Sequence, residues 1–348
     1  MNLQQLRYRI GIGGLPWVAK TALGVALDVL APKRASPATF ELGSSSPAAP
    51  RILYLHSGWA IETVGRLWFT HQDLARVTFM KADAAAISGV LFAEYDLIWY
   101  GYSSLYRRHP CDPAKAVIAV HDPAELFSED PQWKGKPVLG SDKQSLFRAA
   151  RAVVVISKEM EEVLAGAGVT ALRIPTCSTI PARSPSTIAG NDAPLLLAVG
   201  RIYRRKNFEQ FQRIASKAAS TSRVSSYLKG DHFPLSEENY IRLLDRHSIY
   251  LCTSYQEGGP LPVMDAMRRG AVVLSTPVGQ VPEIIQHGVN GFICNEDAEF
   301  LEIIQALGTQ PKRLHDMRLL SLQSISTSRN EPDIAAHSQH VLQTILNR

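Results

Sequence analysis

Two groups of residues in the second half of the chain carry side chains that could do chemistry. The first is a basic cluster that follows a short apolar run and contains Arg201, Arg204, Arg205 and Lys206. An arginine can bind an oxyanion through two parallel hydrogen bonds, and a lysine adds a compact positive charge. The cluster therefore predicts a diphosphate site between a strand and a helix. A solvated basic loop and a nucleic-acid patch are the alternatives.

The second group combines two carboxylates with a glycine-rich turn. Glu257 is followed by the residues Gly258, Gly259, Pro260 and Leu261, and Asp265 lies two helical turns after Glu257. A helix that begins near Leu261 would direct its unpaired N–H groups and the positive end of its dipole towards an anion. One carboxylate could then accept hydrogen bonds from a sugar and the other from ribose hydroxyls. The alternative is a carboxylate at a helix start and an exposed helical aspartate.

The elements that would position these groups alternate between strand and helix. Apolar runs of strand length occur at residues 51–56, 76–80, 95–100, 116–120, 152–156, 172–175, 195–199, 224–228, 249–253, 271–275 and 291–294. Continuous apolar strands separated by helices predict parallel sheets that are covered on both faces. Such sheets bind ligands at the carboxyl ends of their strands. We expect an α/β protein with two Rossmann-like, doubly wound domains that face each other across a cleft.

Composition changes divide the chain into four segments. Residues 35–50 and 183–194 are rich in Pro, Ser, Ala and Gly, which is typical of linkers. We expect an apolar and basic helix with a linker at 1–49, an amino-terminal Rossmann-like domain at 50–190 and a carboxy-terminal Rossmann-like domain at 191–325. We expect residues 326–348 to form a carboxy-terminal helix that packs back on the amino-terminal domain.

The segment 15–30 is mostly apolar and is flanked by basic residues. It is too short and too charged to cross a bilayer, which needs about 20 apolar residues. The residues that follow it also fit a signal-peptide cleavage site poorly. Two interpretations stay open: a helix that packs on its own domain or is partly disordered, or an interfacial helix within residues 1–34 on an anionic membrane surface.

The overall composition narrows the class of protein. Of the 348 residues 45% are apolar, which excludes a disordered chain, and the net charge of +5 is too small for a dedicated nucleic-acid binder. Four cysteines lie far apart without a C-x-x-C sequence, which excludes a zinc ribbon and a disulfide scaffold. Free thiols indicate a reducing compartment. We expect a cytoplasmic protein, peripheral at the inner face of a membrane if residues 1–34 bind lipid.

Three motifs in the second half, taken in order, resemble those of a known family. G-R-x4-K-N begins at Gly200, S-x2-E-G-G-x-L-P-x2-D-A-M-x2-G begins at Ser254, and P-E-I-I-x2-G-x-N-G-F begins at Pro282. In order, spacing and residue type, residues 195–294 resemble the retaining glycosyltransferases of family 4, which have the GT-B fold. In the amino-terminal half the resemblance rests on the strand pattern and on the residues around His121 and Ser157.

The resemblance implies a role for each matching residue. Arg201 and Lys206 match the pair that binds the donor diphosphate and stabilises it as it leaves. Glu257 matches the first acid of the family's E-x7-E motif, which lies against the donor sugar. Asp265 matches the second acid, which binds the ribose, although it is one methylene shorter than the usual glutamate. His121 matches the histidine that contacts the sugar near the reacting centre.

The resemblance also implies contacts with the donor from glycines and from the loop that follows Glu257. They are Gly58, Gly200, Gly258, Gly259, Pro260 and Leu261. Gly58 falls where the family often has a glycine-rich loop, but His56-Ser57-Gly58-Trp59 is a poor version of it.

The resemblance implies a transfer of sugar from a nucleoside diphosphate sugar to a glycan or lipid-linked acceptor, as in polysaccharide biosynthesis. It implies that the domain at 50–190 binds the acceptor and that the domain at 191–325 binds the nucleotide sugar. It implies retention of the anomeric configuration by front-face attack. No D-x-D sequence follows a strand, so we expect neither a metal nor a separate cofactor. A sugar-nucleotide epimerase and an inert nucleotide-sugar-binding module are alternatives. A nucleic-acid partner is not expected, because the basic cluster lacks interleaved aromatic residues. The sugar, the base and the acceptor stay open.

Overall fold

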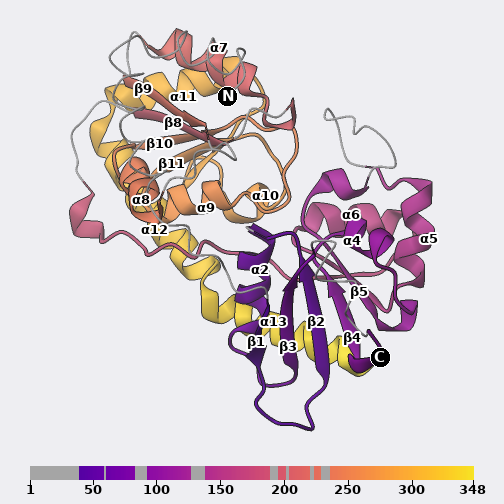
Figure 1. The fold of residues 1–348 in the computed structure, drawn as a ribbon. Helices are drawn as coiled ribbons and strands as arrows, with labels where there is room; N and C mark the ends of the chain where they lie inside the picture. The colour runs from indigo at the N-terminus through magenta and orange to yellow at the C-terminus, as the bar shows by residue number, and fades with distance from the viewer. Residues whose placement is uncertain are drawn as a thin grey trace.

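The computed structural model describes residues 39–58, 60–82, 92–126, 138–188, 195–200, 204–219, 223–228 and 236–348. These residues form two lobes, each built on one sheet (Figure 1). The apolar segment at 15–30 and the membrane contact expected for residues 1–34 lie outside the described residues, as does the expected boundary at 190. Among the helices that are described, none has the length and apolar character to cross a bilayer.

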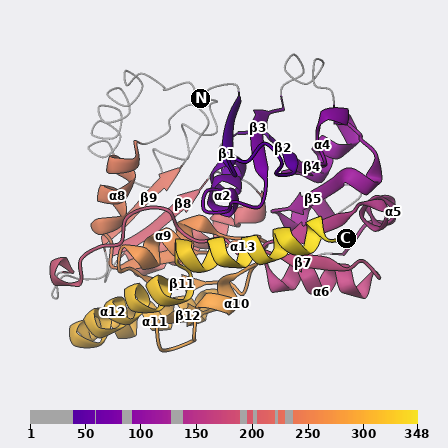
Figure 2. The ribbon, with the colours of Figure 1, turned by 90° about the horizontal axis from the view of Figure 1, so that it is seen from below.

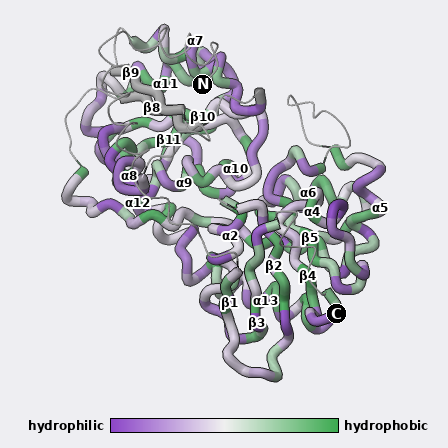
Figure 3. The backbone as a smooth tube through the Cα atoms, viewed as in Figure 1, coloured by the Kyte–Doolittle hydropathy of each residue, from purple (hydrophilic) through white to green (hydrophobic). Residues whose placement is uncertain are grey.

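The amino-terminal lobe contains a seven-stranded sheet with the order β1-β3-β2-β4-β5-β6-β7. Six of its strands are parallel: β2 (Arg51–His56), β3 (Arg76–Lys81), β4 (Leu97–Tyr100), β5 (Ala116–Val120), β6 (Ala152–Val155) and β7 (Ala171–Arg173). Every residue of β4, β5 and β6 is buried, and apolar residues follow the central strands in Figure 3. Burial on both faces explains why these strands are continuous apolar runs rather than alternating patterns.

The first strand corrects the expectation of a linker up to residue 49. Strand β1 (Thr39–Gly43) pairs antiparallel with β3 at the edge of the sheet. Phe40 stacks on Phe79 with 4.7 Å between the ring centroids, and the Arg66 guanidinium lies 3.6 Å above the Phe40 ring. A five-residue edge strand has no run of buried apolar residues. Strand β1 is held in place by its contacts with β3 and with the neighbouring helix. These contacts cannot be read from the local sequence.

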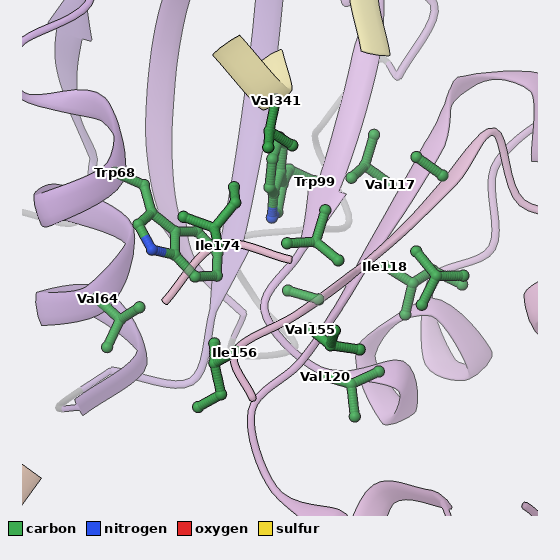
Figure 4. Packing of buried hydrophobic residues seen from close by; sticks show 14 of the residues in the cluster. Val64, Trp68, Trp99, Val117, Ile118, Val120, Val155, Ile156, Ile174 and Val341 are labelled. Atoms are coloured by element: carbon green, nitrogen blue, oxygen red, sulfur yellow. The ribbon is translucent and has the colours of Figure 1, made fainter. Parts of the chain in front are cut away.

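Helices cover both faces of this sheet (Figure 2). They are α2 (Ala60–Phe69), α4 (Ser103–Arg108), α5 (Ser141–Ala149), α6 (Lys158–Gly166) and, from the end of the chain, α13 (Glu331–Leu346). In the core, Trp68 of α2 and Trp99 of β4 lie 6.0 Å apart between centroids, with Val341 of α13 packed in the same cluster (Figure 4). The last helix of the chain therefore completes the core of the first lobe.

The carboxy-terminal lobe has a five-stranded parallel sheet with the order β12-β11-β10-β8-β9. Its strands are β8 (Leu195–Gly200), β9 (Arg223–Leu228), β10 (Ile249–Cys252), β11 (Val272–Ser275) and β12 (Gly291–Ile293). Its helices are α7 (Phe208–Ala218), α8 (Glu237–Asp245), α9 (Leu261–Arg268), α10 (Val281–Ile284), α11 (Asp297–Thr309) and α12 (Pro311–Ser328). Two separate apolar clusters pack the helices onto this sheet. Two doubly wound lobes confirm the predicted fold class.

The chain passes between the lobes twice. The first passage follows β7, and the second lies between α12 and α13, at Arg329 and Asn330. Helix α13 is fixed to the amino-terminal lobe by hydrogen bonds as well as by packing, because Ser338 Oγ donates to the Trp68 carbonyl at 2.6 Å. Arg151 Nε donates to the carbonyl of Ile345 at 3.1 Å. The second passage therefore ties the two lobes together near their junction.

Candidate active site

A buried carboxylate and two cations form the centre of the candidate site. Glu257 lies in the loop between β10 and α9 and is 5% exposed. Lys206 Nζ donates to Glu257 Oε1, and Arg205 Nη1 donates to Glu257 Oε2 at 2.7 Å. Ser254 Oγ also donates to Oε1 at 2.6 Å. Burial alone would raise the pKa of Glu257, but Lys206, Arg205 and these hydrogen bonds outweigh it and bring the pKa to about 2.

Two loops at the carboxyl ends of β8 and β10 bring these groups together. After β8, residues 204–206 form a short 3-10 turn, and Asn207 adopts a left-handed conformation (φ 45°) before α7 begins. Thr253 Oγ1 donates to the carbonyls of Lys206 and Asn207 at 3.3 and 3.2 Å, and the N–H of Tyr255 donates to the Arg205 carbonyl at 2.7 Å. This joining of neighbouring parallel strand ends places Arg205 and Lys206 beside Glu257.

The loop after Glu257 touches the other lobe. A Cβ atom on Gly258 would lie 1.9 Å from the carbonyl oxygen of His121, so only glycine fits this close approach. Arg205 Nη2 also lies 3.0 Å from Asp122 Oδ2. His121 and Asp122 follow strand β5 of the amino-terminal lobe. Their backbone N–H groups donate to the Glu125 carboxylate, that of His121 at 2.9 Å. The glycine-rich loop and the end of β5 are thus in direct contact.

His121 is held as a neutral ring. It is 7% exposed and stacks on Trp68 with 5.1 Å between centroids. Burial lowers its pKa to about 3. Neither ring nitrogen has a hydrogen-bond partner within the described part of the chain. At neutral pH the ring can therefore offer one donor and one acceptor to a ligand, and it carries no charge.

The other expected donor residues lie at separate places. Asp265 is in α9, is 8% exposed, and accepts a hydrogen bond from Tyr240 Oη at 2.9 Å. Pro260 and Leu261 lie where α9 begins, and Gly259 packs against Thr176 of the first passage between the lobes. Gly200 is the last residue of β8. Arg201 lies outside the described residues.

Gly58 belongs to the other lobe, after β2. Its φ of 86° favours glycine, and its N–H donates to His56 Nδ1 at 3.0 Å. Its nearest side chain is Lys81, which lies 3.6 Å from the position of a Cβ. The contacts of Gly58 are thus with the strand ends of its own lobe, while Lys206, Glu257, Gly258 and His121 form one connected cluster.

Comparison with known proteins identifies this arrangement. Residues 231–319 match the family model described as Glycosyl transferases group 1. HepE of Anabaena, solved with UDP-glucose, aligns with a TM-score of 0.62 over 85% of this chain and 100% of its own, at 17% identity. This chain has the GT-B fold, and its carboxy-terminal lobe contains the segment that matches the glycosyltransferase model. Sucrose-phosphate synthase of Thermosynechococcus elongatus, at 14% identity, aligns with a TM-score of 0.61 over 86% of this chain and 99% of its own.

One curated relative is similar to this chain over a short segment. It is the N-acetyl-alpha-D-glucosaminyl L-malate synthase of Bacillus anthracis, with 36% identity over 58 residues. The segment covers 17% of this chain and 15% of that relative.

Three residues of the candidate site were not predicted. The sequence indicates Arg205 only as part of the basic cluster, although it contacts Glu257 and Asp122. Asp122 directly follows His121, so its place at a strand end was a usable signal. Tyr240, which donates to Asp265, comes from α8 and has no local signal, because the two elements meet only in the folded lobe.

Proposed function

We propose that this protein is a glycosyltransferase of family 4. It transfers a sugar from a nucleoside diphosphate sugar to a glycan or lipid-linked acceptor, with retention and without a metal. The observation that carries the proposal is the buried Glu257, paired with the partly exposed Lys206 and Arg205 and in contact, through Gly258, with His121. It joins cations, a carboxylate and a neutral hydrogen-bonding ring at the meeting point of two Rossmann-like lobes.

The largest electrostatic demand of the reaction is the negative charge that builds on the departing diphosphate. Arg201 and Lys206 bind this group in our proposal, with the start of α9 and the backbone of residues 258–261. Positive groups aimed at a developing charge are an efficient source of catalysis. They also supply the positive charge that a divalent metal supplies in other transferases, so the proposed reaction is metal-independent.

The carboxylates and the histidine position the donor. The ionised Glu257 accepts hydrogen bonds from sugar hydroxyls, and Asp265 from the ribose. The neutral His121 hydrogen-bonds to the sugar from the other lobe and is not a general base. The acceptor oxygen bonds to the anomeric carbon on the face from which the phosphate leaves. The carbon–phosphate-oxygen bond breaks, and the departing phosphate takes the acceptor proton.

The structural relatives support a uridine nucleotide as the first donor to test. HepE has been solved with UDP-glucose, and also with UDP and glucose. A thermal-shift screen of UDP, GDP, ADP and TDP identifies the base. A ligand at a hundred times its dissociation constant stabilises the folded protein by about 2.7 kcal/mol. No shift with any of the four would contradict the proposal.

A donor-hydrolysis assay tests the chemistry itself. Release of UDP from UDP-glucose is compared in the wild type and in Lys206→Ala. We expect a loss of about 10²- to 10³-fold, the usual effect of removing one group that stabilises a developing negative charge. Lys312→Ala is the control, because Lys312 is an exposed lysine on α12. Equal rates in Lys206→Ala and the wild type would contradict the proposal. NMR of the product separates transfer with retention from epimerisation of the donor.

A cytoplasmic location with peripheral membrane contact through residues 1–34 completes the proposal. A basic, apolar segment on an anionic surface would favour a lipid-linked acceptor. Co-sedimentation of the full-length protein with anionic vesicles tests it. The idea fails if the protein stays in the supernatant.

A further inference from the structure

The P-E-I-I motif contains a carboxylate that the proposed chemistry does not use. Glu283 lies in α10 of the carboxy-terminal lobe, and its side chain is 13% exposed. We propose that Glu283 is a positioning residue that holds the glycine-rich donor loop at its place against the amino-terminal lobe. The inference rests on the proposed function, because it assigns Glu283 a role in placing the donor.

Both oxygens of Glu283 accept hydrogen bonds from outside its own helix. Oε1 accepts from the backbone N–H of Lys158, the first residue of α6, at 2.8 Å. Oε2 accepts from Arg173 Nη1 at 2.9 Å and from Arg329 Nη2 at 3.1 Å. The N–H groups of a first helical turn have no partner within the helix, and a carboxylate there also meets the positive end of the dipole. Glu283 thus caps a helix of the other lobe.

These donors come from three separate segments of the chain. Lys158 begins a helix of the amino-terminal lobe, and Arg173 ends its last strand. Arg329 marks the second passage between the lobes. The carbonyl of Arg173 additionally accepts from His337 Nε2 of α13 at 2.6 Å. One carboxylate therefore joins both lobes and both passages between them.

The turn before Glu283 carries this connection to the donor loop. The N–H of Gly279 donates to Glu159 Oε2 of α6 at 3.2 Å, and the N–H of Gln280 donates to the Gly258 carbonyl at 3.0 Å. Gly279 packs directly on the loop, because a Cβ there would lie 2.1 Å from the Gly258 oxygen and 2.5 Å from that of Glu257. If α10 moved away from α6, Gly258 would therefore move with it relative to the amino-terminal lobe.

A movement of the donor loop would change the distances between groups that lie on opposite lobes. His121 belongs to the first lobe, and Glu257, Lys206 and Asp265 belong to the second. A misplacement of about 1 Å between reacting groups can cost on the order of 100-fold in rate. Loss of Glu283 should therefore lower the turnover of the donor, while the affinity for UDP, whose proposed contacts all lie in the second lobe, should stay nearly constant.

The test compares Glu283→Ala and Glu283→Gln with the wild-type protein. We expect Glu283→Ala to release UDP from UDP-glucose with a kcat at least tenfold lower, and to bind UDP with a Kd within about twofold of wild type, because a shift of about 1 Å suffices for such a loss. Glu283→Gln keeps an acceptor for the Lys158 N–H and should recover part of the rate. Small-angle scattering should show a larger radius of gyration for Glu283→Ala.

Asp297→Ala is the matched control. It removes a carboxylate that also binds an arginine, Arg213 Nε at 2.8 Å, but within one lobe. It should retain the wild-type kcat and radius of gyration. A wild-type kcat in folded Glu283→Ala overturns the inference. If that variant does not fold, Glu283→Gln is the deciding variant. A wild-type kcat together with a wild-type radius of gyration in Glu283→Gln then overturns the inference. A wild-type protein that neither binds UDP nor hydrolyses UDP-glucose refutes the proposed donor instead, and the scattering then tests the contact between the lobes.

Discussion

The charge of Glu257 offers the sharpest test of the site. Glu257→Gln keeps the size of the side chain and one acceptor oxygen but removes the anion that Lys206 and Arg205 contact. Arg205 retains Asp122 as an ionic partner at 3.0 Å, while the ion pair of Lys206 is lost. Breaking such a partly buried ion pair on one side is costly, because the remaining Lys206 charge stays partly desolvated. The variant should therefore be less stable and bind a sugar donor less productively.

The magnitude follows from the pKa of this carboxyl. It lies at about 2 in the folded protein against a model-peptide value of 4.5, and each pKa unit corresponds to about 1.4 kcal/mol. The ionised Glu257 therefore contributes about 3 kcal/mol to the free energy of unfolding at neutral pH. Because the folded-state pKa is depressed, this contribution is complete above pH 4.5 and is lost as the pH falls towards and through 2. About 2 kcal/mol remains at pH 3.5.

Urea unfolding of the wild type and Glu257→Gln between pH 7 and pH 3 measures this difference. We expect a gap of about 3 kcal/mol at pH 7, reduced by the hydrogen bonds that glutamine still makes, and a steady decrease of the gap below pH 4.5. Glu302→Gln, an exposed residue of α11, is the control and should show no such trend. A gap that is the same at pH 7 and pH 3 would refute the reasoning, since the stabilisation would then not come from the charge.

Three further predictions concern the contact between the lobes at Gly258, the charge of His121 and the contact of Asp265 with the donor. Gly258→Ala should lower turnover at least 100-fold, because its Cβ would overlap the His121 carbonyl. Steady-state kinetics measures this loss, and calorimetry should show little change in the unfolding midpoint of either lobe. The pH profile of kcat should have no limb from His121 between pH 5 and 8, because burial lowers its pKa to about 3, and a limb that disappears in His121→Asn would contradict this. Asp265→Asn should weaken UDP about tenfold in calorimetric titrations and leave pyrophosphate binding unchanged, as expected for a charged hydrogen bond to ribose; equal losses for both ligands would place Asp265 at the phosphate instead.

Much of the fold could be predicted from local sequence. Strands buried on both faces are continuous apolar runs, so β2, β5 and β11 could be located within a residue or two, and their alternation with helices implied parallel sheets. The candidate site was partly predictable for the same reason. In a parallel sheet the residues that follow neighbouring strands meet at one edge, and this places Lys206 after β8 near Glu257 after β10.

The sequence by itself determined the fold class, the two-lobe organisation and the residue types at the donor loop, because periodicity and strand-end position are local properties. Only the tertiary structure decided that β1 is an edge strand, that Arg205 bridges Glu257 and Asp122, and that His121 is buried and neutral. It also decided the place of Glu283, whose three partners are separated from it by 46 to 125 positions in the chain. Such contacts depend on how the two lobes meet, and no periodic pattern within one segment encodes that arrangement.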